Sequence, residues 1–527
     1  MDFAIPDRLN AATLFVDGNV RAGRGQQVAV IDANQGTHAT YADVLAAVNR
    51  TGNALLARGV RQEERVMILL PDCPEFVFTF FGAMKIGAVP VPVNTLLTPP
   101  EYAYLLNDCR ARVLVVSREQ RPAIDAVRSD VRHLEHVLEV GAASAGQDSL
   151  HAALAQGSRE LTPADTSKDD AALWLYSSGT TGFPKGTVHL HHDLLVCAAA
   201  TGRGVLALTA TDRTFSVARL FFAYGLGNAL YFPFSVGAST ILWRGKPDPA
   251  TCFDIVSRYR PTVFYGVPTA YAAMLTVIDA GTPVDMSSVR LCSSAGEPLA
   301  ASLYERWKAR FGIDILDGIG STEMLHTFIS NRPGRVRPGS SGELVPGYEA
   351  RIVGGDGADL PAGEVGDLLV KGDSAFAYYW NRHEQTKATI QGEWIRTGDK
   401  YSRDADGYFW YKGRSDDMLK AGGYWVSPAE VESTLAAHPA VLECGVVGRE
   451  DDERLVKPVA FVVLRPGHSG DRALVEELQA FVKARLAPYK FPRWIEFVPD
   501  LPRTATGKLQ RYKLRELANP HRSSASV

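Results

Sequence analysis

The chain has 527 residues, of which 46% are hydrophobic and 22% charged, as in an ordinary soluble globular protein. This length exceeds what one simple core supports, so two or more domains are expected. The 56 basic and 59 acidic residues leave a net charge of −3, which gives no support for nucleic acid or an anionic membrane as the main partner.

The cysteines and the N-terminus indicate a cytoplasmic protein. Six scattered cysteines form no CxxC pair and no zinc spacing with histidine, which is typical of reduced core thiols. The first residues lack a basic segment followed by an apolar one, so no secretory signal is expected. No apolar run reaches the roughly 18 residues that a membrane-spanning helix requires.

The first part of the chain alternates between strand-like and helix-like segments. Strands are expected at 66–70, 89–93 and 113–116, and helices at 74–86 and from about residue 99. This alternation predicts right-handed crossovers and a parallel sheet. Residues 118–168 follow no clear pattern, and further strands are expected at 173–176, 262–265 and 289–293.

A loop rich in glycine and hydroxyl side chains follows the strand at 173–176. It reads Ser177-Ser178-Gly179-Thr180-Thr181-Gly182-Phe183-Pro184-Lys185-Gly186. Successive uncovered amides can surround an anion, and Lys185 adds a positive charge, so the loop is predicted to bind phosphate. It is not a Walker A loop, because Pro184 precedes the lysine and Gly186 follows it. A surface linker is disfavoured by the apolar strand before it.

The amino-acid composition changes in the last third of the chain. Residues 343–370 are rich in Gly, Pro and β-branched residues, which favours antiparallel strands. After Arg414 a small α+β unit is expected, with helices at 428–437 and 471–486 and strands at 444–448, 458–464 and 494–498.

Five further motifs follow the loop in order. They are SAGEPL at 294–299, DGIGSTE at 317–323, TGD at 397–399, GRSDDMLKAGG at 413–423 and PRTATGK at 502–508. With the loop, this set resembles the signature of the adenylate-forming enzymes, the family of acyl-CoA synthetases, luciferases and peptide-synthetase adenylation domains. The resemblance spans about residues 40–515.

The resemblance implies an α/β fold with two domains. Residues 1–413 would form a large N-terminal domain of stacked α/β sheets plus a distorted β-barrel. Residues 414–527 would form a small mobile α+β domain, joined by a hinge at 414–417 that includes Asp416. Hinges belong at such junctions because short segments there absorb large backbone changes.

The resemblance also assigns the nucleotide site. Asp317 would face the adenine amino group, Asp399 and Arg414 would bind the ribose, and Glu323 would hold Mg²⁺. Ile319 stands where the family commonly has a stacking tyrosine, so adenine would rest on an aliphatic face. The full set of nucleotide-binding residues is Ser177, Ser178, Gly179, Thr180, Thr181, Gly182, Ala295, Gly296, Glu297, Asp317, Gly318, Ile319, Asp399 and Arg414.

The implied reaction joins a carboxylate to ATP, releases pyrophosphate, and passes the acyl group from AMP to a nucleophile. The catalytic residues would be Lys185, Thr322, Lys420 and Lys508. Thr322 would contact the α-phosphate, and Lys508 would reach the cleft during adenylation. Lys420 would act in the second half-reaction, with Gly422, Gly423 and Tyr424 beside the entering CoA thiol.

The acyl pocket is expected between residues 219–228 and 323–326. In peptide-synthetase domains an aspartate lies near the position of Ala223, and its absence counts against an amino-acid substrate. The predicted lining has room for a flat aromatic acid and consists of Phe222, Ala223, Tyr224, Gly320, Leu325 and His326. The combination of FFAYGLGN and GIGSTEMLH resembles the benzoate–CoA ligases and their 4-hydroxybenzoate relatives. Core packing remains an alternative for Phe221.

CoA is the expected acyl acceptor, and the enzyme would be a monomer or homodimer. The basic residues Lys483, Arg485, Lys490 and Arg493 would meet CoA phosphates, or else form a solvated helix face. One alternative is an enzyme that adenylates a hydroxybenzoate or another small acid and loads CoA or a carrier protein. Another is a nucleotide-binding regulatory module without turnover. His189, His191 and His192 lack distant partner ligands, so no zinc site is expected.

Overall fold

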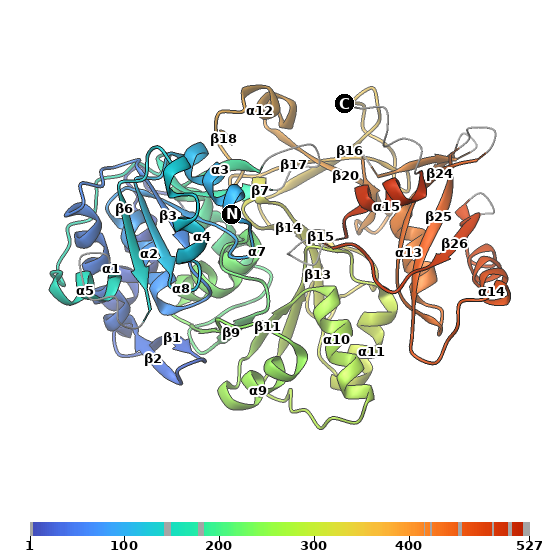
Figure 1. Cartoon of the computed structure of the whole chain (residues 1–527), viewed down its shortest axis with the longest axis horizontal. Helices are drawn as coiled ribbons and strands as arrows, with labels where there is room; N and C mark the ends of the chain where they lie inside the picture. The colour runs from blue at the N-terminus through green and yellow to red at the C-terminus, as the bar shows by residue number, and fades with distance from the viewer. Residues whose placement is uncertain are drawn as a thin grey trace.

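The computed structural model describes residues 4–141, 149–177, 184–415, 417–421, 424–451, 456–486, 490–503 and 509–519. A large unit and a smaller C-terminal unit lie side by side (Figure 1). The predicted fold class is confirmed, because stacked α/β sheets and an antiparallel sheet build the large unit and an α+β arrangement builds the small one. The boundary between residues 413 and 414 stays a prediction, and Asp416 lies outside the described residues.

The largest sheet is parallel at its centre and antiparallel at both edges. Its nine strands are, in order, β15 (Glu343–Leu344), β14 (Thr327–Ser330), β13 (Ile315–Gly320), β12 (Leu291–Ser294), β11 (Val263–Gly266), β9 (Arg213–Ser216), β10 (Ser239–Leu242), β1 (Val28–Asp32) and β2 (Thr37–Thr40). One apolar cluster joins this sheet to the helices α9 (Pro249–Tyr259), α10 (Pro268–Asp279) and α11 (Ala301–Phe311). The carboxyl ends of β12 and β13 carry two of the predicted motifs.

A second sheet of four parallel strands confirms the parallel pairing predicted for the first part of the chain. Its order is β4 (Val89–Pro92), β3 (Arg65–Leu69), β5 (Val113–Ser117) and β6 (His136–Val140). Strands β3, β4 and β5 are almost wholly buried, which explains their continuous apolar sequences. The helices around it are α1 (Tyr41–Leu56), α2 (Pro74–Lys85) and α3 (Pro99–Cys109). Helix α1 begins where Thr40 and Asp43 form a capping box.

Two antiparallel sheets complete the large unit. The first contains β18 (Tyr378–Tyr379), β8 (Lys185–Leu190) and β7 (Ala171–Ser177). The second lies where the distorted barrel is predicted, and it contains β16 (Glu349–Val353), β17 (Gly366–Lys371), β20 (Trp394–Arg403), β19 (Ile390–Gln391) and β21 (Phe409–Arg414). Its register shifts within the β17–β20 and β20–β21 pairs, as bulges do where a sheet bends.

The small unit has its own apolar core, which β24, β25, α13 and α14 share. Its strands are β22 (Leu419–Ala421), β23 (Tyr424–Val426), β24 (Val441–Glu450), β25 (Val456–Leu464) and β26 (Trp494–Phe497). Its helices are α13 (Pro428–Ala436), α14 (Arg472–Lys483) and α15 (Arg511–Ala518). The predicted helices and strands match α13, α14, β24, β25 and β26 to within a few residues, whereas β22, β23 and α15 were not predicted.

Short elements occupy the remaining segments. The α-helices are α4 (Arg121–Asp125), α5 (Leu150–Gln156), α6 (His191–Cys197), α7 (Ala223–Leu226), α8 (Phe232–Val236) and α12 (His383–Thr389). The π-helical turns are η1 (Thr13–Asp17), η2 (Val20–Arg24), η4 (Ala198–Arg203) and η5 (Gly227–Tyr231), and the 3₁₀ turns are η3 (Arg128–Asp130) and η6 (Thr322–Met324). The described residues between 118 and 168 form only short elements, which explains why no pattern stands out there.

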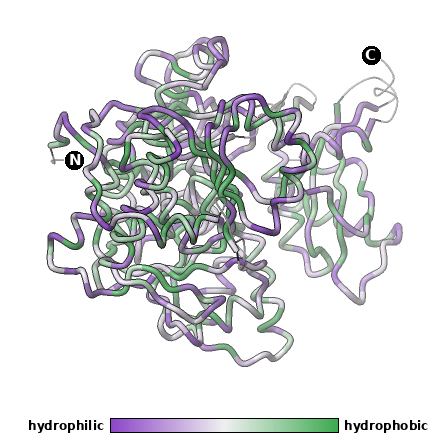
Figure 2. Tube along the Cα trace, turned by 60° about the vertical axis from the view of Figure 1, so that its left-hand side comes forward, coloured by the Kyte–Doolittle hydropathy of each residue, from purple (hydrophilic) through white to green (hydrophobic). Residues whose placement is uncertain are grey.

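Apolar segments run through the interior of the large unit, and polar segments lie mostly on its outside (Figure 2). Every cysteine is a free thiol, and Cys444 alone is partly exposed. Within the described part of the chain, no helix is long and apolar enough to cross a membrane.

A buried lysine joins three segments of the N-terminal part. The Lys85 side chain is 1% exposed, and its Nζ donates to Asp17 Oδ1 at 2.6 Å and to Asn49 Oδ1 at 2.7 Å. Replacing Lys85 with methionine would leave both acceptors buried or half-buried without their donor. We expect Lys85→Met to lower the free energy of unfolding by about 2–4 kcal/mol, measured by urea denaturation. The exposed Lys246→Met is the matched control, and an equal effect in both variants would contradict this prediction.

Candidate active site

The predicted phosphate loop connects two antiparallel strands. Strand β7 ends at Ser177 and β8 begins at Lys185, and these two residues are paired across the sheet. The connecting residues Ser178, Gly179, Thr180, Thr181 and Gly182 lie outside the described residues. The loop therefore starts and ends at one place, with Lys185 fixed at the end of a strand.

Lys185 lies against an aromatic ring and near a carboxylate. Its Nζ is 4.1 Å from the centroid of the Tyr379 ring, a cation–π contact. Burial lowers the pKa of Lys185, the Glu323 carboxylate raises it and Arg414 lowers it further. Three predicted site residues from distant segments are thus brought close enough to affect one another.

The turn that carries Thr322 and Glu323 follows β13 directly. Ser321 caps this 3₁₀ turn by accepting the Met324 backbone N–H at 3.2 Å. The Tyr379 hydroxyl donates to Glu323 Oε1 at 2.6 Å. Tyr379 therefore contacts both the predicted Mg²⁺ ligand and the predicted phosphate-binding lysine.

The predicted adenine site lies at the ends of β12 and β13. Ser294 and Asp317 are partners across this parallel pair. Ala295 is buried, Glu297 is partly exposed, and Gly296 has a φ of 91°, a backbone conformation that favours glycine. A Cβ on Gly318 would lie 2.7 Å from the Ile329 carbonyl oxygen, so β14 approaches closely there.

Asp317 is buried with one oxygen free to accept. The Leu299 backbone N–H donates to Oδ2 at 3.3 Å, whereas Oδ1 has no hydrogen-bond partner among the described residues. Burial raises the pKa of Asp317 to about 8, against smaller opposing effects of the Leu299 N–H and the Ser294 hydroxyl. The half-buried Ile319 lies two residues further along β13.

The predicted ribose ligands are neighbours in the five-stranded sheet. Asp399 on β20 and Arg414 at the end of β21 are paired, and Arg414 Nη1 lies 3.2 Å from Asp399 Oδ1. The same nitrogen donates to the Thr397 carbonyl oxygen at 3.1 Å. Gly398, which lies between Thr397 and Asp399 in the sequence, has a φ of 76°, which lets the chain turn at this point.

The predicted acyl pocket gathers aromatic side chains. Phe221 is 6% exposed, which fits the core-packing alternative, whereas Phe222, Ala223 and Tyr224 are partly exposed. Ala223 and Tyr224 also pack against the main apolar core. The Tyr224 hydroxyl donates to Ser293 Oγ at 3.1 Å.

His326 lies beside Tyr224 as a neutral ring. Its centroid is 5.5 Å from that of Tyr224 and 4.4 Å from that of Phe232. Burial lowers the pKa of His326 to about 3, and its Nε2 lies 3.2 Å from the Tyr224 carbonyl oxygen. A Cβ on Gly227 would lie 2.4 Å from His326 Cδ2, so the imidazole packs directly on the backbone there.

Two other residues of the predicted acyl pocket, Gly320 and Leu325, are constrained by the backbone around them. A Cβ on Gly320 would lie 2.6 Å from the His326 carbonyl oxygen. Leu325 is fully buried with a φ of 61°. Any larger residue at 320 would push the His326 backbone away from β13.

The residues predicted to contact CoA lie in the small unit. Lys420 is in β22 and Tyr424 is in β23, and Gly422, Gly423 and Lys508 lie outside the described residues. The basic residues 483, 485 and 493 lie over aromatic rings, with Lys483 and Arg493 about 4 Å from the centroid of Phe491. Lys490 instead donates to Glu430 Oε2 at 2.6 Å.

The three histidines after the loop contact protein groups, and Asp193 is shared by His189 and His192. His191 Nδ1 accepts the Ala11 backbone N–H at 3.2 Å, and burial lowers the pKa of His191 to about 4. His189 contacts Asp193 and the Thr322 carbonyl oxygen, and His192 contacts Lys168. Within the described residues, no group of three or more His, Cys, Asp and Glu side chains is arranged to hold a metal ion.

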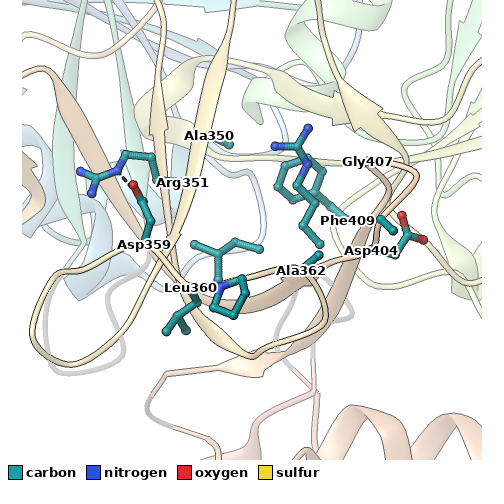
Figure 3. Close-up of a pocket in the computed structure, with 12 residues that line it drawn as sticks. Ala350, Arg351, Asp359, Leu360, Ala362, Asp404, Gly407 and Phe409 are labelled. Atoms are coloured by element: carbon teal, nitrogen blue, oxygen red, sulfur yellow. Dashed lines mark hydrogen bonds and ion pairs between the residues drawn. The ribbon is translucent and has the colours of Figure 1, made fainter.

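A surface cavity of about 410 Å³ lies apart from the predicted site residues, on the five-stranded sheet (Figure 3). Its charged lining is largely paired, with Arg351 donating to Asp359 Oδ1 at 2.7 Å and Asp404 accepting from Arg337 at 2.9 Å. None of the residues predicted to bind nucleotide or acid lines it.

Sequence reasoning did not find Tyr379 or His189 as site residues. Tyr379 is 56 positions from Glu323, and His189 is 133 positions from Thr322. Contacts between such distant segments depend on how the sheets pack, and no local pattern shows them.

Comparison with known proteins places the chain in a family. The family of AMP-binding enzymes matches residues 19–380, and the C-terminal domain of AMP-binding enzymes matches residues 430–508. The chain therefore belongs to the AMP-binding enzyme family, which confirms the predicted resemblance.

Its relatives within that family share nearly the whole chain. A benzoate–CoA ligase of Thauera aromatica is 51% identical and aligns over 97% of this chain and 96% of its own. A 4-hydroxybenzoate–CoA/benzoate–CoA ligase of Rhodopseudomonas palustris is 46% identical, over 96% of this chain and 94% of its own. The solved structure of the anthranilate CoA ligase AuaEII with anthranoyl-AMP has a TM-score of 0.94 and 46% identity, covering 98% of this chain and 99% of that chain.

The ionisation of Asp317 should make stability depend on pH. An unfolded aspartate titrates at about 4, whereas burial raises the pKa of Asp317 to about 8 in the folded protein. Between these values the folded protein binds a proton that the unfolded chain has lost, so stability falls as pH rises through this window. Asp317→Asn carries no such proton, and its stability relative to the native sequence should increase from pH 5 to 8.5.

Urea denaturation of the ligand-free proteins at several pH values measures this difference. The exposed Asp254→Asn serves as the matched control. A difference between Asp317→Asn and the native sequence that stays constant across the pH range would contradict the prediction.

Proposed function

We propose that the chain is an ATP-dependent aryl-CoA ligase that converts benzoate or a close analogue into its CoA thioester through an acyl-AMP. One short segment supports this proposal, because residues 321–326 supply both Glu323 on the phosphate side and His326 on the aromatic side. An acid in the pocket would thus have its carboxylate directed at the α-phosphate. The relatives that act on benzoate, hydroxybenzoate and anthranilate support an aryl acid.

The pocket side of the site favours an uncharged ring. His326 is neutral because burial lowers its pKa to about 3, so it offers no cation to a second carboxylate. The Phe232 ring lies 4.4 Å from His326 and fills the space behind it, which disfavours a long alkyl chain. The segment 219–228 contains no Asp or Glu that could pair with the amino group of an amino-acid substrate.

The nucleotide side fits ATP and Mg²⁺. Asp317 Oδ1 is buried and has no hydrogen-bond partner among the described residues, so it could accept a hydrogen bond from the adenine amino group. Glu323 provides carboxylate oxygens, the ligands that Mg²⁺ prefers, and Tyr379 orients them. A Mg²⁺ ion held there would neutralise charge on the triphosphate.

In the first half-reaction, a carboxylate oxygen of the acid bonds to the α-phosphorus, and the bond to pyrophosphate breaks. Lys185 and Lys508 offset the charge that moves to pyrophosphate, while Thr322 contacts the α-phosphate. In the second, the CoA sulfur attacks the acyl carbon, its proton goes to solvent, and AMP leaves. Lys420, Gly422, Gly423 and Tyr424 would guide the thiol.

A substrate panel tests the proposed function. We expect pyrophosphate release with ATP and Mg²⁺ to be fastest with benzoate or a hydroxy- or aminobenzoate. Release of AMP from the acyl-AMP should require CoA. Octanoate and phenylalanine are the contrasting acids. Faster release with either would show that the pocket is misread, and ATP binding without pyrophosphate release would favour the regulatory-module alternative.

The two lysines of the small unit should affect opposite half-reactions. Lys508→Ala should slow acyl-AMP formation by about 100- to 1,000-fold and leave thioester formation from supplied benzoyl-AMP and CoA nearly unchanged. Lys420→Ala should show the reverse. Pyrophosphate exchange and single-turnover thioester formation measure the two steps, and equal losses in both steps would contradict the assignment.

A further inference from the structure

Strand β8 presents alternate residues toward the site. Lys185, Thr187 and His189 occupy positions i, i+2 and i+4, so their side chains leave the same face of the strand. Lys185 at one end contacts Tyr379, and His189 at the other end contacts the turn of Thr322 and Glu323. One rigid element therefore spans the lysine and the turn.

His189 is fully buried between two acceptors. Its Nε2 lies 2.7 Å from the Thr322 carbonyl oxygen, and its Nδ1 lies 2.7 Å from Asp193 Oδ2. A carbonyl oxygen can only accept, so Nε2 donates to Thr322, while the Asp193 carboxylate holds the ring at its other nitrogen. Asp193 Oδ2 also accepts the Leu190 backbone N–H at 3.0 Å, and His192 Nε2 lies 3.1 Å from Oδ1.

The turn is held at each of its carbonyl groups. His189 donates to the oxygen of Thr322, the Phe376 backbone N–H donates to that of Glu323 at 2.7 Å, and Ser374 Oγ donates to that of Met324 at 2.8 Å. Only the first of these three donors comes from the strand that carries Lys185. The hydrogen bond of the His189 side chain thus links the strand of Lys185 directly to the backbone of the Thr322–Glu323 turn.

Energetics favour a geometric role for this bond. The hydrogen bond from His189 to the Thr322 carbonyl oxygen is short, at 2.7 Å. Removing one partner of the buried pair His189–Asp193 would destabilise the fold, whereas a variant that keeps a donor to Asp193 loses only the hydrogen bond to Thr322. Loss of the hydrogen bond to Thr322 should therefore change where the turn lies more than whether the protein folds.

We infer that His189 is a positioning residue for acyl-AMP formation, which acts by fixing Thr322 and Glu323 relative to Lys185. The inference rests on the proposed function, because acyl-AMP formation is the reaction proposed there. It concerns the first half-reaction, because the α-phosphate and Mg²⁺ contacts are formed there. Thioester formation from a completed acyl-AMP should depend on it far less.

Two isosteric variants separate the two hydrogen bonds of the ring. His189→Gln can place an N–H near the position of Nε2 and retain the bond to Thr322, while removing the donor to Asp193. His189→Asn can place an N–H near the position of Nδ1 and retain the bond to Asp193, while removing the donor to Thr322. His192→Asn, which changes the other neighbour of Asp193, is the matched control.

We expect His189→Asn to slow pyrophosphate exchange by about 10- to 100-fold, since misplacement of about 1 Å costs that much. Its thioester formation from supplied benzoyl-AMP should stay within about twofold of the native sequence, and His189→Gln should retain most of the exchange activity. A merely structural role through Asp193 predicts the opposite order, with the Gln variant worse. Equal losses in both half-reactions, or a Gln variant no better than Asn, would overturn the inference.

Binding of MgATP in the absence of any acid, measured by calorimetry, gives a readout that does not depend on the aryl substrate. It should weaken in His189→Asn and not in His189→Gln. Failure of the native protein to release pyrophosphate with any acid would refute the proposed function, while this binding difference would still decide the inference. Should His189→Asn fail to fold, Asp193→Asn takes its place, with a smaller expected loss confined to exchange and MgATP binding. Equal losses of exchange and thioester formation in Asp193→Asn would overturn the inference.

Discussion

Two opposite charges that we propose act on one nucleotide both contact the same tyrosine. Lys185 lies over the face of the Tyr379 ring, and Glu323 accepts from the hydroxyl of the same side chain. A direct ion pair would satisfy both charges and leave less of each for phosphate and cation. The ring face stabilises the ammonium without an acceptor oxygen, and the hydroxyl fixes one carboxylate oxygen while the other can bind a ligand.

Burial sets the charge of the groups on either side of that arrangement. Desolvation raises the pKa of Asp317 to about 8 and lowers that of His326 to about 3, so near neutral pH both side chains are mostly uncharged. The ligand-free site thus has neutral walls where adenine and a ring would bind. Its charges are concentrated between these walls, where phosphate chemistry would need them.

The sequence predicted the elements far better than the contacts between them. Apolar runs such as 66–70 and 113–116 form buried strands because their side chains cover both faces of a parallel sheet. Motif order predicted roles for Lys185, Asp317, Glu323, Asp399 and Arg414, which lie within strands or directly after one. The Tyr379 and His189 contacts were missed, because sheet packing brings together residues far apart in the chain. Short elements within 118–168 were missed because a five- or seven-residue helix gives too few periods to recognise.

The contacts around residue 416 bear on how the small unit could move. Ser415 belongs to the large unit, since its N–H donates to the Gly398 carbonyl oxygen and its hydroxyl donates to Asp367 Oδ1 at 2.9 Å. Asp417 contacts both units, since its N–H donates to the Arg414 carbonyl oxygen at 3.0 Å and Arg515 on α15 donates to its carboxylate at 2.6 Å. The side chains of Ser415 and Asp417 are thus held by different units. A rotation that kept both side-chain contacts would have to change the backbone between them, within the hinge that the sequence predicts at 414–417.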